Sequence, residues 1–318
     1  MKQIEFLTMY DGRRVAVVVP AYQEERLIAE TLLGIPDFVD DVIVVDDCSS
    51  DGTSEAAAAV ADDRIEVVRL ERNQGVGGAI ITGHKRAMER GADIMVVMAG
   101  DNQMDPEELP RLLAPIVVEG YGFAKGNRFY ATGGVGGMPA HRVVGNMLMT
   151  FLNKASSGYW NIVDPQNGYT AVTRESLEMV PLDRVARRYQ FENDLLVWLN
   201  IANVRATDVN IPARYGTEVS TIRLSTEVPR IFWQMFTGFW RRVWFKYFLW
   251  SFSPIAVMLV AGMLFTFVGL VVGAWTTAVA LGGDSPSAGT TILSVVPFMS
   301  GFYLLIQAMV LDIQATPD

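Results

Sequence analysis

The fold is decided by the stretch Asp93-Ile-Met-Val-Val-Met-Ala-Gly-Asp-Asn-Gln-Met-Asp-Pro106. Its apolar run, Ile94 to Met98, predicts a strand buried on both faces, and the run stops in small residues before Asp101 and Gln103. A carboxylate at the C-terminal end of such a strand points into the crevice where open α/β sheets bind ligands. An oxygen ligand there suits a divalent metal that holds a diphosphate. The alternative is that Asp101 caps a helix beginning near Pro106.

Three more strand-like runs precede this stretch, and segments with helical patterns separate them. The runs are Val15 to Val19, Val42 to Val45 and Ile65 to Leu70. The separating segments are long enough for the crossover connections that a parallel sheet requires. The sequence therefore predicts the α/β fold class.

Polar residues follow each of these runs, and in a doubly wound sheet such strand ends converge on one edge. They are Pro20 to Glu25, Asp46 to Thr53 and Arg72 to Ala79. The edge thus offers the carboxylates, amides and glycine turns of a nucleotide-diphosphate site. Because consecutive strand side chains point in opposite directions, only one of Asp46 and Asp47 can face a given pocket wall. We expect Asp47 to contact the nucleoside and Asp46 to be structural.

Two patterns in these loops have competing interpretations. The segment Ser49-Ser-Asp-Gly-Thr53 is typical of a turn and helix cap, in which a side chain accepts from free backbone N–H groups. The glycines of Gly75-Val-Gly-Gly-Ala79 do not follow the first strand, so the dinucleotide fingerprint is not met and no nicotinamide or flavin site is expected. We expect these glycines to let a helix N-terminus come close to strand or ligand backbone.

The C-terminal part of the chain differs in composition from the rest. Ser253 to Ile313 holds only two charged residues, both aspartates. Within it, Ile255 to Leu281 and Thr291 to Leu311 are long enough to span a hydrocarbon core. The turn-forming segment Gly282 to Gly289 between them predicts a hairpin of two transmembrane helices. Buried core helices are the alternative.

Basic residues are interleaved with aromatic residues just before this hairpin. The basic residues are Arg230, Arg241, Arg242 and Lys246. Rings at headgroup depth and cations near lipid phosphate are what an interfacial helix needs. We therefore expect a domain 1–225, amphipathic juxtamembrane helices 226–252 and a transmembrane part 253–318. The positive-inside bias predicts an integral membrane protein, of the cell membrane or an ER-type membrane, with its N-terminal domain in the cytoplasm.

Charge and composition argue against several other functions. The chain has 26 basic and 35 acidic residues and a formal net charge of −9, so nucleic acid is not an expected partner. An anionic ligand must then be held by local basic residues or by a metal. Met1 to Phe6 lacks the apolar segment of a secretory signal. With one cysteine and two histidines, the sequence offers neither an intramolecular disulfide nor a Cys/His zinc site.

Several motifs occur in an order and at a spacing that resemble a known family. They are Val-Val-Pro20-Ala-Tyr22-Gln-Glu24, Val45-Asp46-Asp47 with Ser49-x-Asp51-Gly52-Thr53, Gly100-Asp101-x-Gln103-x-x-Pro106, Gly126-Asn-Arg128-Phe129, Asp164-Pro-Gln-Asn-Gly168-Tyr, and Ile211-Pro-Ala-Arg-Tyr with Glu218 and Ser220. The chain from about Val15 to Ser220 resembles the inverting GT-A glycosyltransferases of family 2. Within that family it is similar to the polyprenyl-phosphate sugar transferases of the dolichol-phosphate mannosyltransferase type, whose membrane-bound members have a similar two-helix anchor.

The resemblance implies a GT-A domain with a mixed, mainly parallel sheet, and it assigns roles to individual residues. The nucleotide would be bound by Pro20, Tyr22, Glu24, Val45, Asp47, Ala99, Gly100 and Asp101. A divalent metal, Mg²⁺ or Mn²⁺, would be held by Asp101 and Gln103. The acceptor phosphate would be bound by Arg128, Arg142, Asn146, Arg214 and Ser220. The catalytic residues would be Asp101, Arg128, Arg142 and Glu192.

The chemistry of arginine supports part of this assignment independently of the family. A guanidinium is a fixed, permanently charged fork that matches phosphate bidentately. Arg128 and Arg142 therefore suit the acceptor phosphate or the leaving diphosphate. The alternative for either arginine is a surface ion pair.

The sequence departs from the family pattern at three positions. Ala99 stands where the metal motif usually has its first aspartate, so the diphosphate and Gln103 must supply more of the metal's ligands. Thr221 stands where many members have a lysine, and Arg214 or Arg223 would have to supply that charge. The third is Asn146, which replaces a hydroxyl residue.

The implied reaction is inverting transfer of a hexose from a GDP- or UDP-sugar to polyprenyl phosphate, either dolichyl or undecaprenyl, at the cytoplasmic membrane face. Glu192 and Asp194 lie where other family 2 enzymes place a base for hydroxyl acceptors, so a membrane glycosyltransferase acting on a sugar hydroxyl is the first alternative. The competing structural interpretation of Glu192 is a carboxylate on a helix surface that pairs with Arg188. A non-catalytic, nucleotide-sugar-binding membrane subunit is the second alternative, favoured only by Ala99. The sugar, the nucleotide base, the polyprenol and homo-oligomerisation stay open.

Overall fold

The computed structural model describes residues 12–128, 140–165, 167–212 and 224–317, with the backbone alone for 140–146 and 224–229. Two compact units make up the chain. The first is Met1–Phe239 with Pro317–Asp318, and the second is Trp240–Thr316. Each unit is described by itself.

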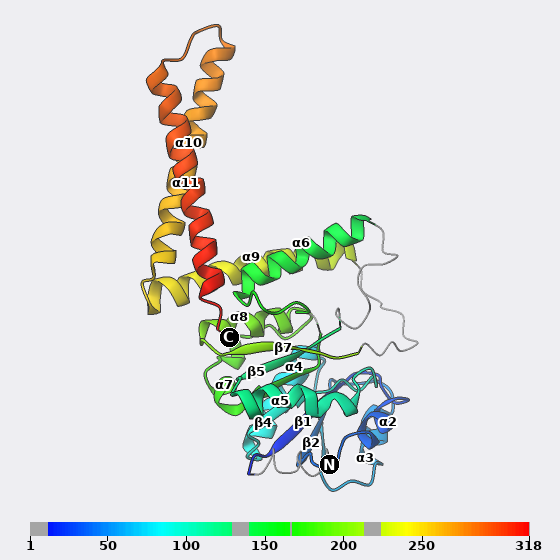
Figure 1. Ribbon diagram of the computed structural model, residues 1–318. Coiled ribbons are helices and arrows are strands. Elements are labelled where there is room, and N and C mark those ends of the chain that lie inside the picture. The colour runs from blue at the N-terminus through cyan, green and yellow to red at the C-terminus, as the bar shows by residue number, and fades with distance from the viewer. Residues whose placement is uncertain (1–11, 129–139, 166, 213–223, 318) are drawn as a thin grey trace. The chain divides into compact units, whose positions relative to one another are not determined.

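The first unit is built on a mixed sheet (Figure 1). Within the described residues, seven strands follow the order β3-β2-β1-β4-β6-β5-β7. The strands are β1 (Val15–Ala21), β2 (Asp41–Asp46), β3 (Ile65–Arg69), β4 (Ile94–Val97), β5 (Phe123–Asn127), β6 (Thr170–Thr173) and β7 (Ala206–Asn210). β6 is antiparallel to its neighbours β4 and β5, and the other pairs are parallel. The predicted α/β class with a mixed, mainly parallel sheet is confirmed.

The central strands are buried along their whole length. Every residue of β1, β2 and β4 is buried, as expected for apolar runs covered by helices on both faces. Val17 of β1 pairs with Val42 on one side and Val96 on the other. Removing each such side chain from water stabilises the fold by roughly 1.5–3 kcal/mol.

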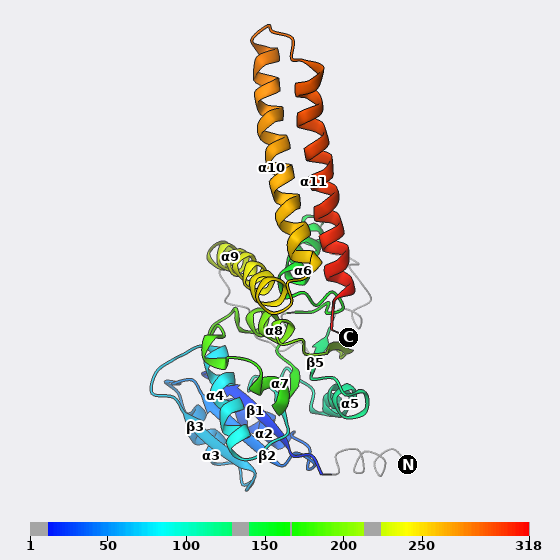
Figure 2. The same cartoon turned by 90° about the vertical axis from the view of Figure 1, so that its left-hand side faces the viewer.

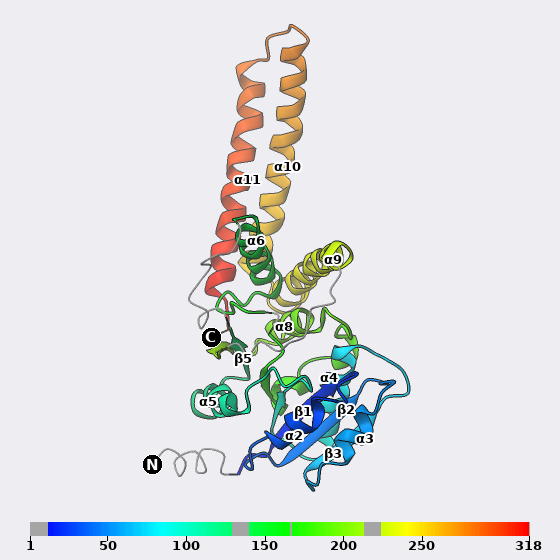
Figure 3. The same ribbon diagram turned by 90° about the vertical axis from the view of Figure 1, so that its right-hand side faces the viewer.

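Helices lie between and after the strands, and some of them cover the two faces of this sheet. They are α2 (Ile28–Leu33), α3 (Thr53–Ala58), α4 (Val76–Glu89), α5 (Leu109–Glu119), α6 (Ala140–Ser157), α7 (Arg174–Glu178), α8 (Phe191–Ile201) and α9 (Leu224–Arg242), with 3₁₀ turns η1 (Pro106–Glu108) and η2 (Leu182–Arg184). Figures 2 and 3 show α4 and α5 on opposite sides of the sheet. Ile28 and Leu32 of α2 share one core with Leu112 of α5 and with Val17 of β1.

The second unit contains a π-helical segment, η3 (Val243–Trp250), and two long apolar helices, α10 (Pro254–Leu281) and α11 (Ala288–Gln314). Both long helices have the length and composition to cross a membrane. Only 22% and 11% of their most apolar windows are buried, which is less protein cover than core helices have. Glycine allows close packing between them, because a Cβ on Gly269 would lie 2.5 Å from the backbone nitrogen of Phe298.

A buried ion pair lies within this second unit. Arg242 Nη1 is 2.5 Å from Asp312 Oδ1, and Arg242 Nη2 is 3.0 Å from Asp312 Oδ2. The Tyr247 hydroxyl also donates to Asp312. The pair therefore joins the segment before the hairpin to the last turn of α11.

Candidate active site

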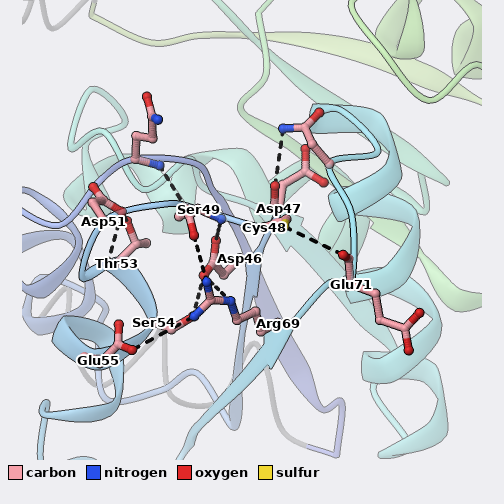
Figure 4. Close-up of polar contacts among 12 residues, drawn as sticks. Asp46, Asp47, Cys48, Ser49, Asp51, Thr53, Ser54, Glu55, Arg69 and Glu71 are labelled. Carbon is pink, nitrogen blue, oxygen red and sulfur yellow. Dashed lines mark hydrogen bonds and ion pairs between the residues drawn. The ribbon is translucent and has the colours of Figure 1, made fainter.

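The loops after β1 and β2 are tied together at the C-terminal edge of the sheet (Figure 4). Ser49 Oγ accepts from the Gln23 N–H at 3.0 Å, and Thr53 Oγ1 accepts from the Glu24 N–H at 2.9 Å. Asp51 Oδ1 accepts from the Thr53 N–H at 3.2 Å, which matches the predicted turn. The N-cap of α3 is Gly52, and no side chain caps that helix. The turn thus holds the loop that carries Tyr22.

The two consecutive aspartates after β2 differ in their contacts. Asp46 is fully buried; its Oδ1 accepts from the Ser49 N–H at 2.8 Å, and its other oxygen accepts from the Ser54 hydroxyl (Figure 4). Asp47 accepts from the N–H groups of Gln74 at 2.6 Å and Gly75 at 2.8 Å. Asp46 therefore holds its own loop, whereas Asp47 links the end of β2 to the start of α4.

The glycines at the start of α4 allow close approach by another segment. Gly78 N–H donates to the carbonyl oxygen of Arg187 at 2.9 Å. A Cβ on Gly77 would lie 2.6 Å from the Cβ of Phe191, the first residue of α8. The expected close backbone approach is therefore made to the segment that leads into α8.

Asp101 lies in the loop after β4. Its Oδ1 accepts from the Gln103 N–H at 3.1 Å, and burial raises the pKa of its carboxyl group. The next helical turn is capped by Asp105, which accepts from the Glu107 N–H at 3.0 Å. The alternative that Asp101 caps this helix is therefore wrong. Gly100 N–H donates to Pro20 O at 3.1 Å, which joins this loop to the one after β1.

Left-handed backbone conformations occur in all three of these loops. Gln23, Cys48 and Asn102 have φ values of 61°, 63° and 56°. Such conformations cost energy in residues other than glycine and tend to cluster at functional sites. Their positions after β1, β2 and β4 point to this edge of the sheet as the site.

The donor atoms at this edge can hold a divalent metal only with help from a substrate. Within the described part of the chain, no group of three or more His, Cys, Asp and Glu side chains is arranged to hold a metal ion. Asp101 and Gln103 offer one carboxylate and one amide. They fit Mg²⁺, which commonly binds through one or two carboxylates together with substrate phosphate and water.

Two adjoining cavities open at this edge. The Tyr22 cavity, of about 220 Å³, is lined by Pro20, Ala21, Tyr22, Asp47, Asn73, Gly75, Val76 and Ala79. The Arg128 cavity, of about 340 Å³, is lined by Val76, Arg128, Tyr189, Glu192 and Asn193. Val76 at the start of α4 lines both. A larger cavity of about 510 Å³ includes Gly12, Asp93 and Gly122, which precede their strands, and holds none of the predicted site residues.

Arg128 follows β5 and pairs with a buried carboxylate. Its Nε is 2.8 Å from Asp164 Oδ2, and its Nη2 is 3.2 Å from Asp164 Oδ1. The Arg128 side chain is 46% exposed and that of Asp164 only 2%. The interaction is therefore a bidentate ion pair at a cavity wall, between a half-exposed guanidinium and a buried carboxylate.

Glu192 is in the first turn of α8 and lines the Arg128 cavity. Burial raises the pKa of its carboxyl group, and the charge of Lys125 lowers it. The carboxylate thus belongs to the cavity and not to an exposed helix face beside Arg188. Lys125, which is buried in β5, was missed by sequence reasoning because a lysine in a short strand reads as a surface residue.

The remaining predicted site residues either do not line the two cavities or lie outside the described part of the chain. Val45 is fully buried in β2, and neither Val45 nor Glu24 lines the two cavities. Ala99 N–H donates to Met104 Sδ at 3.3 Å. Arg214 and Ser220 lie outside the described residues, as do the side chains of Arg142 and Asn146, whose backbone is in α6.

The fold and the sheet edge define a glycosyltransferase of the GT-A type. The family described as glycosyl transferase family 2 matches residues 16–180, and the chain belongs to that family. The chain is similar to the UDP-N-acetylglucosamine–dolichyl-phosphate N-acetylglucosaminyltransferase of Methanococcus voltae, with 28% identity over 224 residues that cover 66% of this chain and 88% of the relative. It is also similar to the undecaprenyl-phosphate mannosyltransferase of Micrococcus luteus, with 33% identity over 187 residues that cover 57% of this chain and 76% of the relative.

A solved structure supports the fold. Glucosyl-3-phosphoglycerate synthase from Mycobacterium tuberculosis, in complex with Mn²⁺, UDP-glucose and phosphoglyceric acid, aligns with a TM-score of 0.55 and 24% identity. The alignment covers 75% of this chain and 82% of that structure. The two apolar C-terminal helices fit membrane anchoring.

Proposed function

We propose that this chain transfers a hexose from a nucleotide diphosphate sugar to polyprenyl phosphate, with inversion at the anomeric carbon. The observation that carries the proposal is the pair of adjoining cavities, one with Tyr22 and Asp47 and the other with Arg128 and Glu192. A nucleoside fits the first cavity, and the sugar with an anionic acceptor fits the second. The names of the similar proteins, which act on dolichyl and undecaprenyl phosphate, support this acceptor class.

The proposed chemistry needs positioning and charge stabilisation more than proton transfer. A phosphate acceptor is already an anion near neutral pH, so it needs no strong base. The Arg128 guanidinium would bind the acceptor phosphate or stabilise the leaving diphosphate. A divalent metal on Asp101 and Gln103, when bound, would neutralise the charge of the diphosphate.

The membrane side of the proposal rests on the C-terminal elements. Phe232, Trp233 and Phe236 are exposed on α9, which suits a helix at the lipid interface. Basic residues beside the aromatic ones favour the cytoplasmic face by the positive-inside rule. We infer that transfer takes place there, where a lipid phosphate is within reach.

Glu192 favours one second candidate, transfer to a sugar hydroxyl. A hydroxyl acceptor needs a general base, and a buried carboxylate with a raised pKa in the same cavity as Arg128 suits that role. The two candidates share the donor site and differ only in the acceptor.

Labelled GDP- and UDP-sugars, incubated with purified membranes and polyprenyl phosphate, test the proposal. We expect a chloroform-soluble labelled lipid that requires Mg²⁺ or Mn²⁺. Label confined to water-soluble glycan would favour the hydroxyl acceptor instead. Donor binding without turnover of any donor would contradict both candidates. Membranes that contain the Asp101→Ala variant serve as the control for background enzymes.

A further inference from the structure

Lys125, in the middle of β5, is 1% exposed, although lysine is almost never fully buried without a partner. It lines a narrow cavity together with Gly168 and Glu192. Its ammonium group donates a hydrogen bond to the carbonyl oxygen of Asn167. The lysine therefore contacts the Asn167 segment and lines the same cavity as Glu192 of α8.

The Asn167 contact connects Lys125 to Arg128. Asn167 Nδ2 donates to the carbonyl oxygen of Gly126 at 2.8 Å, and Asn167 N–H donates to Asp164 O at 3.4 Å. Asp164 holds the Arg128 guanidinium through both carboxylate oxygens. Because hydrogen bonds weaken steeply when their geometry changes, a shift at Lys125 is passed to Asp164 and to Arg128.

Three carboxylates and one guanidinium lie close enough to the Lys125 ammonium for their charges to change its pKa. They are Glu192 in α8, Asp164, Asp208 in β7, and Arg128 after β5. Burial lowers the pKa of Lys125, and the three carboxylates raise it. Burial raises the pKa of Glu192, and Lys125 lowers it. The lysine charge thus opposes protonation of Glu192.

Asp208 completes this buried group. Its Oδ2 accepts from Asn127 Nδ2 at 2.9 Å and from the Val163 N–H at 2.6 Å. Burial raises the pKa of Asp208 to about 6, and Lys125 and the bonded N–H groups lower it. The charge of Asp208 raises the pKa of Lys154 in α6, whereas burial lowers it. Asp208 is thus held in place by hydrogen bonds from the end of β5 and from the segment that leads to Asp164.

We propose that Lys125 is a positioning residue: through Asn167 and Asp164 it orients Arg128, and through its charge it favours the ionised form of Glu192 in the cavity that the two residues share. The role of Arg128 in transfer rests on the proposed function, whereas the coupling of Lys125 to Glu192 does not. In this proposal, the buried Lys125 affects both the orientation of the Arg128 guanidinium and the ionisation of the Glu192 carboxylate.

Thermal unfolding of the detergent-purified full chain tests the coupling without any substrate. Lys125→Met should lower the midpoint at pH 8 by several degrees, because the partly buried Glu192 then loses the positive charge that offsets its own. In the Lys125→Met background, Glu192→Gln should recover part of this loss. In the wild-type background, the same substitution should not raise the midpoint. Lys85→Met, which removes an exposed lysine paired with Asp183, is the matched control and should leave the midpoint unchanged.

The pH dependence gives a second signature. Loss of Lys125 raises the pKa of Glu192 further above its unfolded value, so the stability gained from protonation is present at low pH and lost as pH rises through the folded pKa. Lys125→Met should thus regain stability between pH 8 and pH 5, and the double variant with Glu192→Gln should not. Equal effects of Glu192→Gln in both backgrounds would overturn the coupling. If Lys125→Met does not fold, recovery of folding in the double variant supports the coupling, and failure of both variants contradicts it.

Transfer kinetics test the link to Arg128. In the Glu192→Gln background, adding Lys125→Met should lower kcat at least tenfold and leave the KM for the donor within about twofold, because the Tyr22 cavity is untouched. Unchanged kcat would overturn the orienting role. If the wild-type chain transfers no sugar, the proposed function fails while the unfolding result still decides the coupling.

Discussion

Asp101 is a partly buried carboxylate whose Oδ1 accepts a hydrogen bond from the Gln103 backbone. Burial raises its pKa, so the folded chain favours the protonated form. That contribution to stability is present at low pH and is lost as pH rises through the raised pKa. A divalent cation would offset the charge at higher pH.

The metal-dependent shift in unfolding temperature should therefore grow with pH. In the presence of UDP or GDP, we expect Mg²⁺ or Mn²⁺ to raise the midpoint by a few degrees at pH 8 and by less at pH 5. Asp101→Asn should remove this shift and reduce transfer by about 100-fold, the usual cost of losing one electrostatic contact in a transition state. A full metal response in Asp101→Asn would exclude this residue as a ligand.

Arg128 offers a second test at the same scale. Arg128→Lys keeps the charge but loses the bidentate fork, and we expect kcat to fall by roughly 10²-fold in Arg128→Lys and further in Arg128→Ala. Arg111→Ala is the control, since Arg111 forms an exposed pair with Glu108 at 2.7 Å on a helix away from both cavities. Wild-type turnover in Arg128→Ala would remove the arginine from the site. Circular dichroism on each variant separates lost chemistry from lost folding.

At the scale of elements, the contact between α4 and the segment before α8 depends on Gly75. Gly75 has φ +85°, and a Cβ there would lie 2.8 Å from the carbonyl oxygen of Arg187. Gly91 has the same φ of +85°, with nothing within 4 Å of an added Cβ. Substitutions at Gly91 and Gly75 therefore carry the same backbone strain, but only the substitution at Gly75 adds a steric clash with the Arg187 segment.

Alanine substitution at these two positions makes the comparison. Gly91→Ala should cost about 1 kcal/mol, because an L-residue is strained at this φ. Gly75→Ala should cost about 2 kcal/mol more, as expected for overpacking, and should weaken donor binding. Urea unfolding measures the first effect and nucleotide titration the second. Equal stability losses would show that the Arg187 segment moves away at little cost.

The buried ion pair of the second unit is a further element-scale feature. Asp312→Asn should destabilise that unit by about 3–5 kcal/mol, because Arg242 is then left buried without its carboxylate. The double variant Arg242→Met with Asp312→Leu should recover most of that loss, since an apolar pair avoids desolvation of charge. Thermal unfolding in detergent provides the measurement. A single variant as stable as the wild type would show that the pair contributes nothing.

The strands differ in how well the sequence predicts them. The predicted runs starting at Val15, Val42, Ile65 and Ile94 correspond to β1, β2, β3 and β4 within two residues at either end. Their β-branched, apolar composition fits the centre of a parallel sheet. β5, β6 and β7 are short and contain Lys125, Thr170 and Asp208, and β6 runs antiparallel. Their pairing depends on tertiary packing that no local pattern encodes.

The candidate site divides in the same way. Tyr22, Asp47 and Asp101 follow predicted strands, so strand order alone places them at one edge. The Arg128–Asp164 pair and the burial of Lys125 depend on β5, β6 and their connections. No local sequence pattern predicts these elements, so neither feature could be predicted from the sequence. The sequence also left the target of the α4 glycines open, because the segment before α8 is far from them along the chain.

At the scale of the whole molecule, a charged sheet edge and an apolar hairpin belong to one chain. A membrane anchor confines the catalytic unit to the surface where a lipid acceptor resides, which raises its effective concentration. The anchor should matter for long-chain lipid and not for the nucleotide sugar. In the proposed function, donor binding depends on Tyr22, Asp47 and Asp101, all of which lie in the first unit.

Ending the chain after Phe252 tests this division. We expect nucleotide affinity, and turnover of a short water-soluble prenyl phosphate, to stay within about twofold of wild type, while use of long-chain polyprenyl phosphate in vesicles falls at least tenfold. A chain in which an unrelated hairpin of equal length replaces residues 254–314 is the matched control. Recovery with that hairpin would mean that the native helices act as a tether, whereas no recovery would mean that they contact the lipid themselves. Unchanged kinetics of the shortened chain on long-chain lipid would show that the anchor is incidental to transfer.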